Sequence, residues 1–138
     1  MYLTMLDENQ KSMFLSLALY LAKIDNDYSL QEQEIIQSYC DEMNIKINQS
    51  AEYESVIQLI SMIDEACDMT TKRIIVFEAI GLALIDRDYS DEEKKIIYLM
   101  SSYFGIEDGY LEECELLLRE YVVFQNKFNS LVFKNNET

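Results

Sequence analysis

The sequence predicts an all-α fold: a single-domain helical bundle of about six to seven helices. Of the 138 residues, 49% are hydrophobic, which is enough to form a core without disulfides or bound metal. Proline is absent and only three glycines occur, so the chain lacks the turn formers that an all-β fold requires. Apolar residues instead recur at helical spacing. We therefore treat residues 1–138 as one domain.

Helix-start signals place three of the expected helices. In each, a capping residue is followed three positions later by Glu or Gln, so that the two side chains can bond reciprocally to first-turn amides. Asn44 and Gly105 suit the left-handed backbone that ends a helix. The predicted helices cover residues 8–23, 30–43 and 91–104, and begin at the pairs Asp7 and Gln10, Ser29 and Glu32, and Ser90 and Glu93.

Two more helices are expected between these, over residues 51–67 and 72–85. Thr70 or Thr71 is the expected cap of the second one. Because that helix is apolar on nearly all sides, we expect it at the centre of the core. Glu78 is its exception, and a buried carboxylate there needs a charge partner. A structural role for Glu78 is favoured over a functional one.

A final helix is expected over residues 109–133, and its second half carries more apolar residues than one helix face can bury. We expect this half to fold back over the rest of the bundle. The alternative is an apolar patch that recruits a partner or forms a homodimer. The residues expected to face inward are Leu111, Cys114, Leu117, Leu118, Tyr121 and Val122, and the excess residues are Val123, Phe124, Phe128, Leu131, Val132 and Phe133.

Charge and missing residue types exclude several functions. With 26 acidic and 11 basic residues the net charge is −15, which disfavours binding to nucleic acid or directly to a membrane surface. No histidine is present, which excludes a Ser-His-Asp triad and any His-ligated metal. Three isolated cysteines and an acidic N-terminal segment indicate a reduced, cytoplasmic protein. We expect no enzymatic activity, no required cofactor and a protein partner.

The chain contains an internal repeat. A shift of 61 positions superimposes residues 17–45 on residues 78–106, with 12 of 29 positions identical. Each copy consists of a helix, a short acidic loop and a capped helix. Repeat one therefore spans about residues 8–45 and repeat two about residues 71–106, as two similar helical hairpins in one core.

The repeated segment carries a recognisable signature: an alanine-containing helix, an acidic loop, and a Glu three residues after the loop. It occurs at residues 24–29 with Glu32 and at residues 85–90 with Glu93. With this doubled signature the chain resembles the TerB-like family over about residues 8–120. The family is named for a tellurite-resistance protein and is also seen in the N-terminal region of a membrane-anchored DnaJ-type co-chaperone. The family's loop glycine is replaced by Asn26 and Arg87. The resemblance implies a helical bundle with an accessory role in stress or resistance.

The resemblance also implies a divalent-cation role for the loop acids. A high-affinity EF-hand site is disfavoured, because loop position 6 is Leu30 or Asp91 instead of Gly and position 12 is Ile36 or Ile97 instead of Glu. At most, weak binding of Ca²⁺ or Mg²⁺ by carboxylate oxygens is expected. The favoured alternative is that the Asp residues close the turns while the Ser and Glu residues cap the helices. The candidate ligands are Asp25, Asp27 and Glu32 in the first loop, and Asp86, Asp88 and Glu93 in the second; Asp27 and Asp88 are not part of the family signature.

These observations predict a non-catalytic TerB-like interaction or accessory module. One alternative is an acidic inhibitor or antitoxin-like protein that binds a basic partner through its net charge of −15. Another is an enzyme that uses buried carboxylates, for which Glu78 beside a loop acid is the only candidate arrangement.

Overall fold

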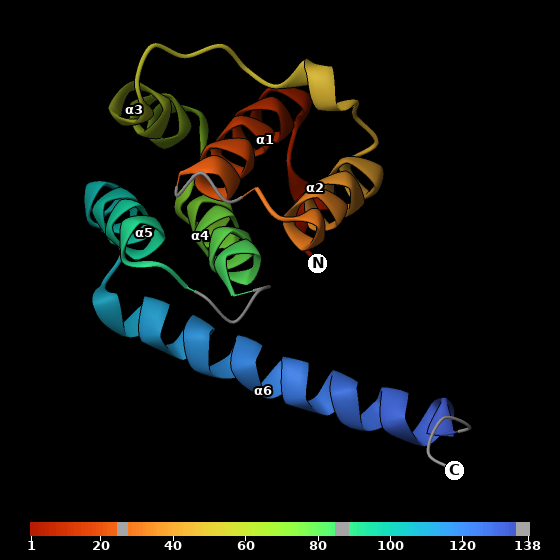
Figure 1. Ribbon diagram of the computed structural model, residues 1–138. Helices are drawn as coiled ribbons and strands as arrows, with labels where there is room; N and C mark the ends of the chain where they lie inside the picture. The colour runs from red at the N-terminus through yellow and green to blue at the C-terminus, as the bar shows by residue number, and fades with distance from the viewer. Residues whose placement is uncertain (25–27, 85–88, 135–138) are drawn as a thin grey trace.

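The fold is all-helical, as the composition predicts (Figure 1). The computed structural model describes residues 1–24, 28–84 and 89–134. Within these ranges every regular element is a helix. The elements are a 3₁₀ turn η1 (Leu3–Met5), α1 (Glu8–Lys23), α2 (Leu30–Met43), a 3₁₀ turn η2 (Ile47–Gln49), α3 (Val56–Ala66), α4 (Met69–Ala83), α5 (Asp91–Phe104) and α6 (Asp108–Val132).

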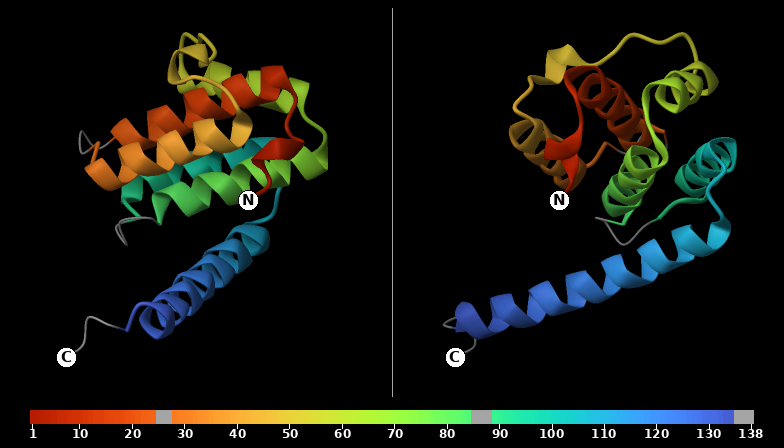
Figure 2. Two further views of the ribbon diagram at one scale, coloured as in Figure 1. Left: turned by 90° about the vertical axis from the view of Figure 1, so that its right-hand side faces the viewer. Right: turned by 180° about the vertical axis from the view of Figure 1, so that it is seen from behind.

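The two repeats form two helical hairpins, α1 with α2 and α4 with α5 (Figure 1). The hairpins lie against each other, with α6 along the outer side of the second one (Figure 2, left). Helix α4 contacts α1, α5 and α6, and η1 rests on α2 and α4. The prediction that the helix rich in apolar residues lies at the centre is confirmed, since α4 is surrounded on several sides.

The three predicted capping boxes are confirmed. The amide of Glu32 donates to Ser29 Oγ at 3.0 Å, and the Ser29 amide donates to Glu32 Oε1 at 3.1 Å. The Ser90 and Glu93 pair repeats this geometry, with the Glu93 amide 3.2 Å from Ser90 Oγ. The expected left-handed ends are also present, since φ is 55° at Asn44 and 77° at Gly105.

Two predicted helix starts are wrong. Helix α3 begins at Val56 instead of residue 51, because the preceding segment bonds to α1: Ser16 Oγ donates to the Ala51 carbonyl at 2.7 Å. Helix α4 begins at Met69 and is capped by Asp68, one turn before the expected start. The Thr71 amide donates to this carboxylate at 2.8 Å, and that bond lowers the pKa of Asp68.

All three cysteines are buried, as small core residues should be. Burial raises the pKa of Cys40 and Cys114, and raises the pKa of Cys67 to about 11. Each thiol is therefore held in its neutral, unreactive form.

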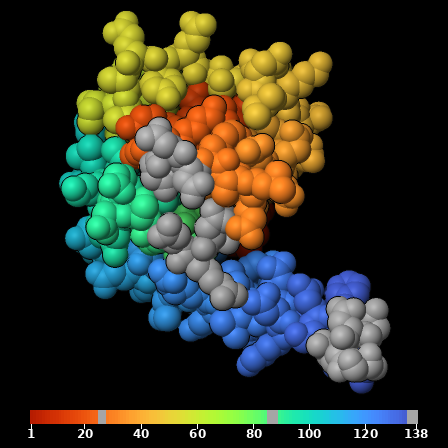
Figure 3. Space-filling view, viewed as in Figure 1, coloured from red at the N-terminus to blue at the C-terminus, as the bar shows by residue number. Residues whose placement is uncertain are grey.

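Helix α6 has 25 residues and a length of about 37 Å. Its first half packs on α4 and α5, but its second half extends beyond the bundle (Figure 1, Figure 3). The predicted folding back of this half is wrong. Leu117, Tyr121 and Val122, expected to face inward, are 57%, 48% and 38% exposed.

The sequence of α6 explains why its second half does not pack on the bundle. The line of residues that faces the core begins with Leu111 and Leu118, which are buried. Two and three helical turns after Leu118, the same line carries Gln125 and Asn129. The face that would meet the core is therefore polar. No helix in the described part of the chain is both long and apolar enough to cross a lipid bilayer.

Candidate interaction surface

The loop acids singled out by the sequence are only partly placed. Asp25, Asp27, Asp86 and Asp88 lie outside the described residues. Glu32 and Glu93 lie in the first turns of α2 and α5, only 6% and 3% exposed, where their carboxylates complete the capping boxes. Across residues 1–24, 28–84 and 89–134, no group of three or more Cys, Asp or Glu side chains is arranged to hold a metal ion.

Glu78, the acid inside the central helix, has the charge partner that its burial requires. It is 4% exposed, and its Oε2 accepts hydrogen bonds from the Met1 amino group at 2.9 Å and from the Tyr2 amide at 2.7 Å. Glu42 on α2 accepts from the same amino group at 3.2 Å and from the Leu3 amide at 3.0 Å. Two acids from two helices therefore fix residues 1–3 on the bundle.

This arrangement alters the ionisation of the amino group. Partial burial opposes its charge, but hydrogen bonds and charge attraction from Glu78 and then Glu42 outweigh burial, and the pKa of the Met1 amino group is raised above its usual 8.0. The contacts of Glu78 thus give it a structural role.

An apolar groove of about 390 Å³ lies between η1, α4 and the first half of α6. Tyr2 and Phe77 meet edge to face across its floor, with ring centroids 5.6 Å apart. Its charged lining residues, Arg73 and Glu113, are both exposed. The lining residues are Tyr2, Met5, Thr70, Arg73, Ile74, Phe77, Tyr110, Glu113, Cys114 and Leu117.

The hydroxyl of Tyr110, which lines the groove, is held in an internal hydrogen bond. The hydroxyl of Tyr110 donates to the Arg73 carbonyl at 2.8 Å, which ties α6 to α4 at the rim. Burial, followed by its interaction with Cys114, raises the pKa of Tyr110. Apolar and aromatic side chains dominate the lining, a composition typical of surfaces that bind apolar partners.

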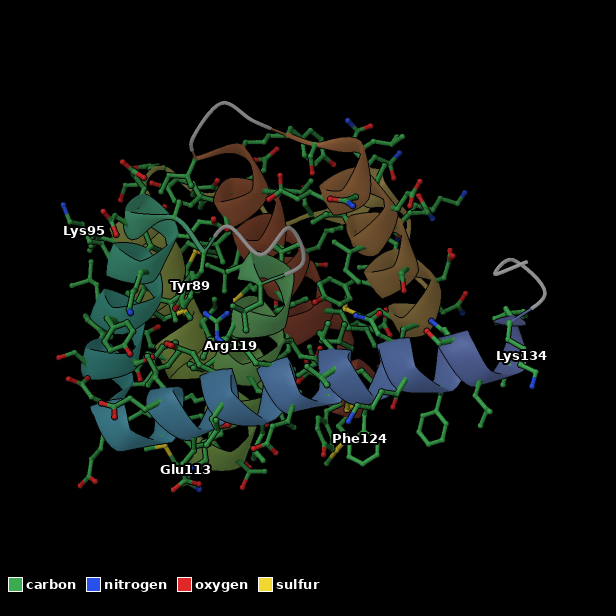
Figure 4. All side chains as sticks on the ribbon, turned by 60° about the horizontal axis from the view of Figure 1, so that its bottom comes forward. Tyr89, Lys95, Glu113, Arg119, Phe124 and Lys134 are labelled. Atoms are coloured by element: carbon green, nitrogen blue, oxygen red, sulfur yellow. The ribbon has the colours of Figure 1, made fainter. Side chains whose placement is uncertain are left out.

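An apolar stripe on α6 continues from this groove onto the projecting half of the helix. We call the residues Leu117, Tyr121, Phe124, Phe128 and Leu131 the α6 seam. Each is between 48% and 68% exposed, and the rings of Phe124 and Phe128 stack at 5.9 Å. Figure 4 shows Phe124 on the same side of α6 as the groove residue Glu113, opposite Arg119, which points toward the bundle.

The seam has a periodic pattern in the sequence that is separate from the internal repeat. One series of apolar residues from Tyr110 to Leu131 is separated by alternating steps of four and three positions: 110, 114, 117, 121, 124, 128 and 131. This is the heptad spacing of helices that pack along one another. The excess of apolar residues in this helix was predicted, but its heptad period was not, and no sequence pattern indicated η1 and α4 as walls of the groove.

Charge is divided sharply along α6. Residues 107–120 contain six acidic residues and one basic residue, for a net charge of −5. Residues 121–134 contain Lys127 and Lys134 and no acidic residue, for a net charge of +2. In a chain with a net charge of −15, the projecting half of α6 is locally positive.

The groove and the seam share Leu117 and form one continuous apolar surface, whose projecting half is not covered by any residue of ranges 1–24, 28–84 and 89–134. Surfaces of this kind are uncommon on monomers and mark binding sites. An amphipathic helix is the partner shape that a groove followed by a helical stripe accommodates. No known family model, curated protein or solved structure matches this chain.

Proposed function

We propose that this protein is a non-catalytic interaction module that binds an amphipathic helix through the groove and the α6 seam. The observation that carries the proposal is the continuity of the two: Tyr110, Cys114 and Leu117, which line the groove, lie in one heptad series with the exposed seam. The internal pairing of Glu78 supports a binding role over a catalytic one, since this acid is engaged by residues 1 and 2.

The biological setting that we propose is an accessory role in stress or resistance. Its support is the resemblance of the doubled acidic-loop signature to the TerB-like family, together with the two capped hairpins in which that signature lies. A weak Ca²⁺ or Mg²⁺ site at the acidic loops belongs to the same proposal and is tested below.

Site-specific photo-crosslinking of the whole chain tests the binding role. A photoreactive phenylalanine analogue replaces Phe124 on the seam, and in a matched control it replaces Tyr103, a 50% exposed aromatic residue on α5. We expect the analogue at position 124 to form a discrete covalent adduct with the bound partner, and the analogue at position 103 to form none. A second change, Leu117→Asp, places a charge in the seam and should abolish the adduct.

Equal adduct patterns at both positions would contradict the proposal, as would an adduct that persists unchanged with Leu117→Asp. Because Phe124 and Leu117 are both exposed, these variants should fold normally. Circular dichroism confirms the fold before each crosslinking experiment.

A further inference from the structure

We propose that the helix bound by this surface is α6 of a second copy of the chain, lying antiparallel to the first. The inference rests on the proposed function and names its partner. In the resulting two-fold dimer, the projecting half of each α6 lies in the groove of the other subunit.

Charge favours the antiparallel direction. In that arrangement the positive half of α6, with Lys127 and Lys134, lies beside the negative half of the other α6, which has a net charge of −5. A parallel pair would place the two negative halves side by side, with Glu113 beside its own copy. The projecting half is the part of this strongly acidic chain that can approach an acidic surface without repulsion.

The heptad series fixes the register. In an antiparallel pair, residue numbers increase along one helix and decrease along the other. The numbers of the two residues in every facing pair therefore add up to the same total. Tyr121 then faces Phe124 of the partner subunit, and Leu117 faces Phe128 of the partner subunit. Cys114, in the groove, faces Leu131 of the partner subunit, and all seam residues are covered.

The exposed apolar surface of the seam and the groove is large enough for a stable interface. At 48–68% exposure, the five seam residues offer about 500 Å² of apolar surface, and Tyr2 and Met5 beside the groove add about 200 Å². The total of about 700 Å² per subunit approaches the ~800 Å² that each partner contributes to a standard protein interface. Both contributions occur twice in the dimer because the interface is symmetric, and no apolar seam is left over for further assembly.

Sedimentation of the full chain provides the first test. At micromolar concentration we expect twice the 16.2 kDa chain mass. The variant Phe124→Asp/Phe128→Asp should sediment as a monomer with unchanged helix content. Val123→Asp is the matched control, because Val123 is 53% exposed on the same helix but lies off the seam, and this variant should stay dimeric.

Disulfide trapping tests the direction. The variant Leu117→Cys/Phe128→Cys should give a covalent dimer under mild oxidation, because position 117 faces position 128 of the partner subunit. Either single change should give none, because its cysteine then faces an unmodified residue of the partner subunit. A bond within one chain is excluded, since the two positions lie about 16 Å apart along the helix. The native cysteines are buried, so the unmodified chain is the background control.

A covalent dimer from either single variant would overturn the antiparallel arrangement. A chain that sediments as a monomer at micromolar concentration would overturn the dimer altogether. If position 124 of that monomer still crosslinks to a different protein, the proposed function stands with another partner. If it forms no adduct, both proposals fail.

Discussion

At the scale of single residues, Glu78 shows how a charge is accommodated within a core helix. The side chains around it on α4 are buried and apolar, and an unpaired carboxylate there would be strongly destabilising. The Met1 amino group and the Tyr2 amide supply the compensation at 2.9 and 2.7 Å. The sequence predicted the need for a partner, but it could not identify residues 1 and 2, because that contact spans most of the chain.

Replacing Glu78 with Gln should lower the free energy of unfolding by about 1–2 kcal/mol, because one buried partner of the pair is lost while the amino group stays half exposed. Urea denaturation at pH 7 measures the change. Glu120→Gln, at an exposed site on α6, is the matched control and should leave stability unchanged. An equal loss in both variants would refute the role assigned to the pair.

The same pair makes stability depend on pH. The folded pKa of the Met1 amino group lies above its unfolded value of 8.0, so its contribution is complete below pH 8. As pH rises from 8, the unfolded chain loses its proton first, and the contribution declines through the folded pKa. The stability of the unmodified chain should therefore fall more steeply than that of Glu78→Gln as the pH rises above 8. Parallel curves would contradict this linkage.

At the scale of helices, the ends with local chemistry were the predictable ones. Ser29 with Glu32 and Ser90 with Glu93 cap as their spacing requires, and Asn44 and Gly105 adopt the expected left-handed conformation. Of the two starts that were wrong, α4 has a local cap in Asp68 without a Glu or Gln three positions later, and the start of α3 depends on a distant bond. The segment before α3 is held extended by Ser16 of α1, a contact that no local pattern contains.

The capping boxes also bear on the candidate cation site. Ser29→Ala and Ser90→Ala should each reduce stability by about 1 kcal/mol, because each removes an oxygen that accepts a first-turn amide. If capping and turn closure are the whole role of these loops, Ca²⁺ should produce equal heats in calorimetric titrations of the unmodified chain and of Asp25→Asn/Asp86→Asn. Saturable heat from the unmodified chain alone would instead establish a cation site.

At the scale of the whole molecule, the fold class and the repeated hairpins follow from composition and periodicity, whereas the binding surface does not. The groove is made by three segments that are distant in sequence, with Met5 from η1, Phe77 from α4 and Leu117 from α6. Of these three segments, only α6 has a recognisable pattern in the sequence, its heptad series. The failure of α6 to fold back shows that apolar content alone does not determine packing, because Gln125 and Asn129 occupy the line that would face the core.

This division of α6 into a packed half and a projecting half leads to a final prediction. Between Val122 and Lys134 every residue is exposed, so a chain that ends at Tyr121 loses no core contact. It should keep its cooperative thermal transition, and its melting temperature should not change with protein concentration. The full chain should melt at a higher temperature as its concentration rises, since assembly stabilises only the folded state. If the truncated chain fails to fold, the second half of α6 stabilises the bundle. If the melting temperature of the full chain does not depend on its concentration, dimer formation does not contribute to its stability.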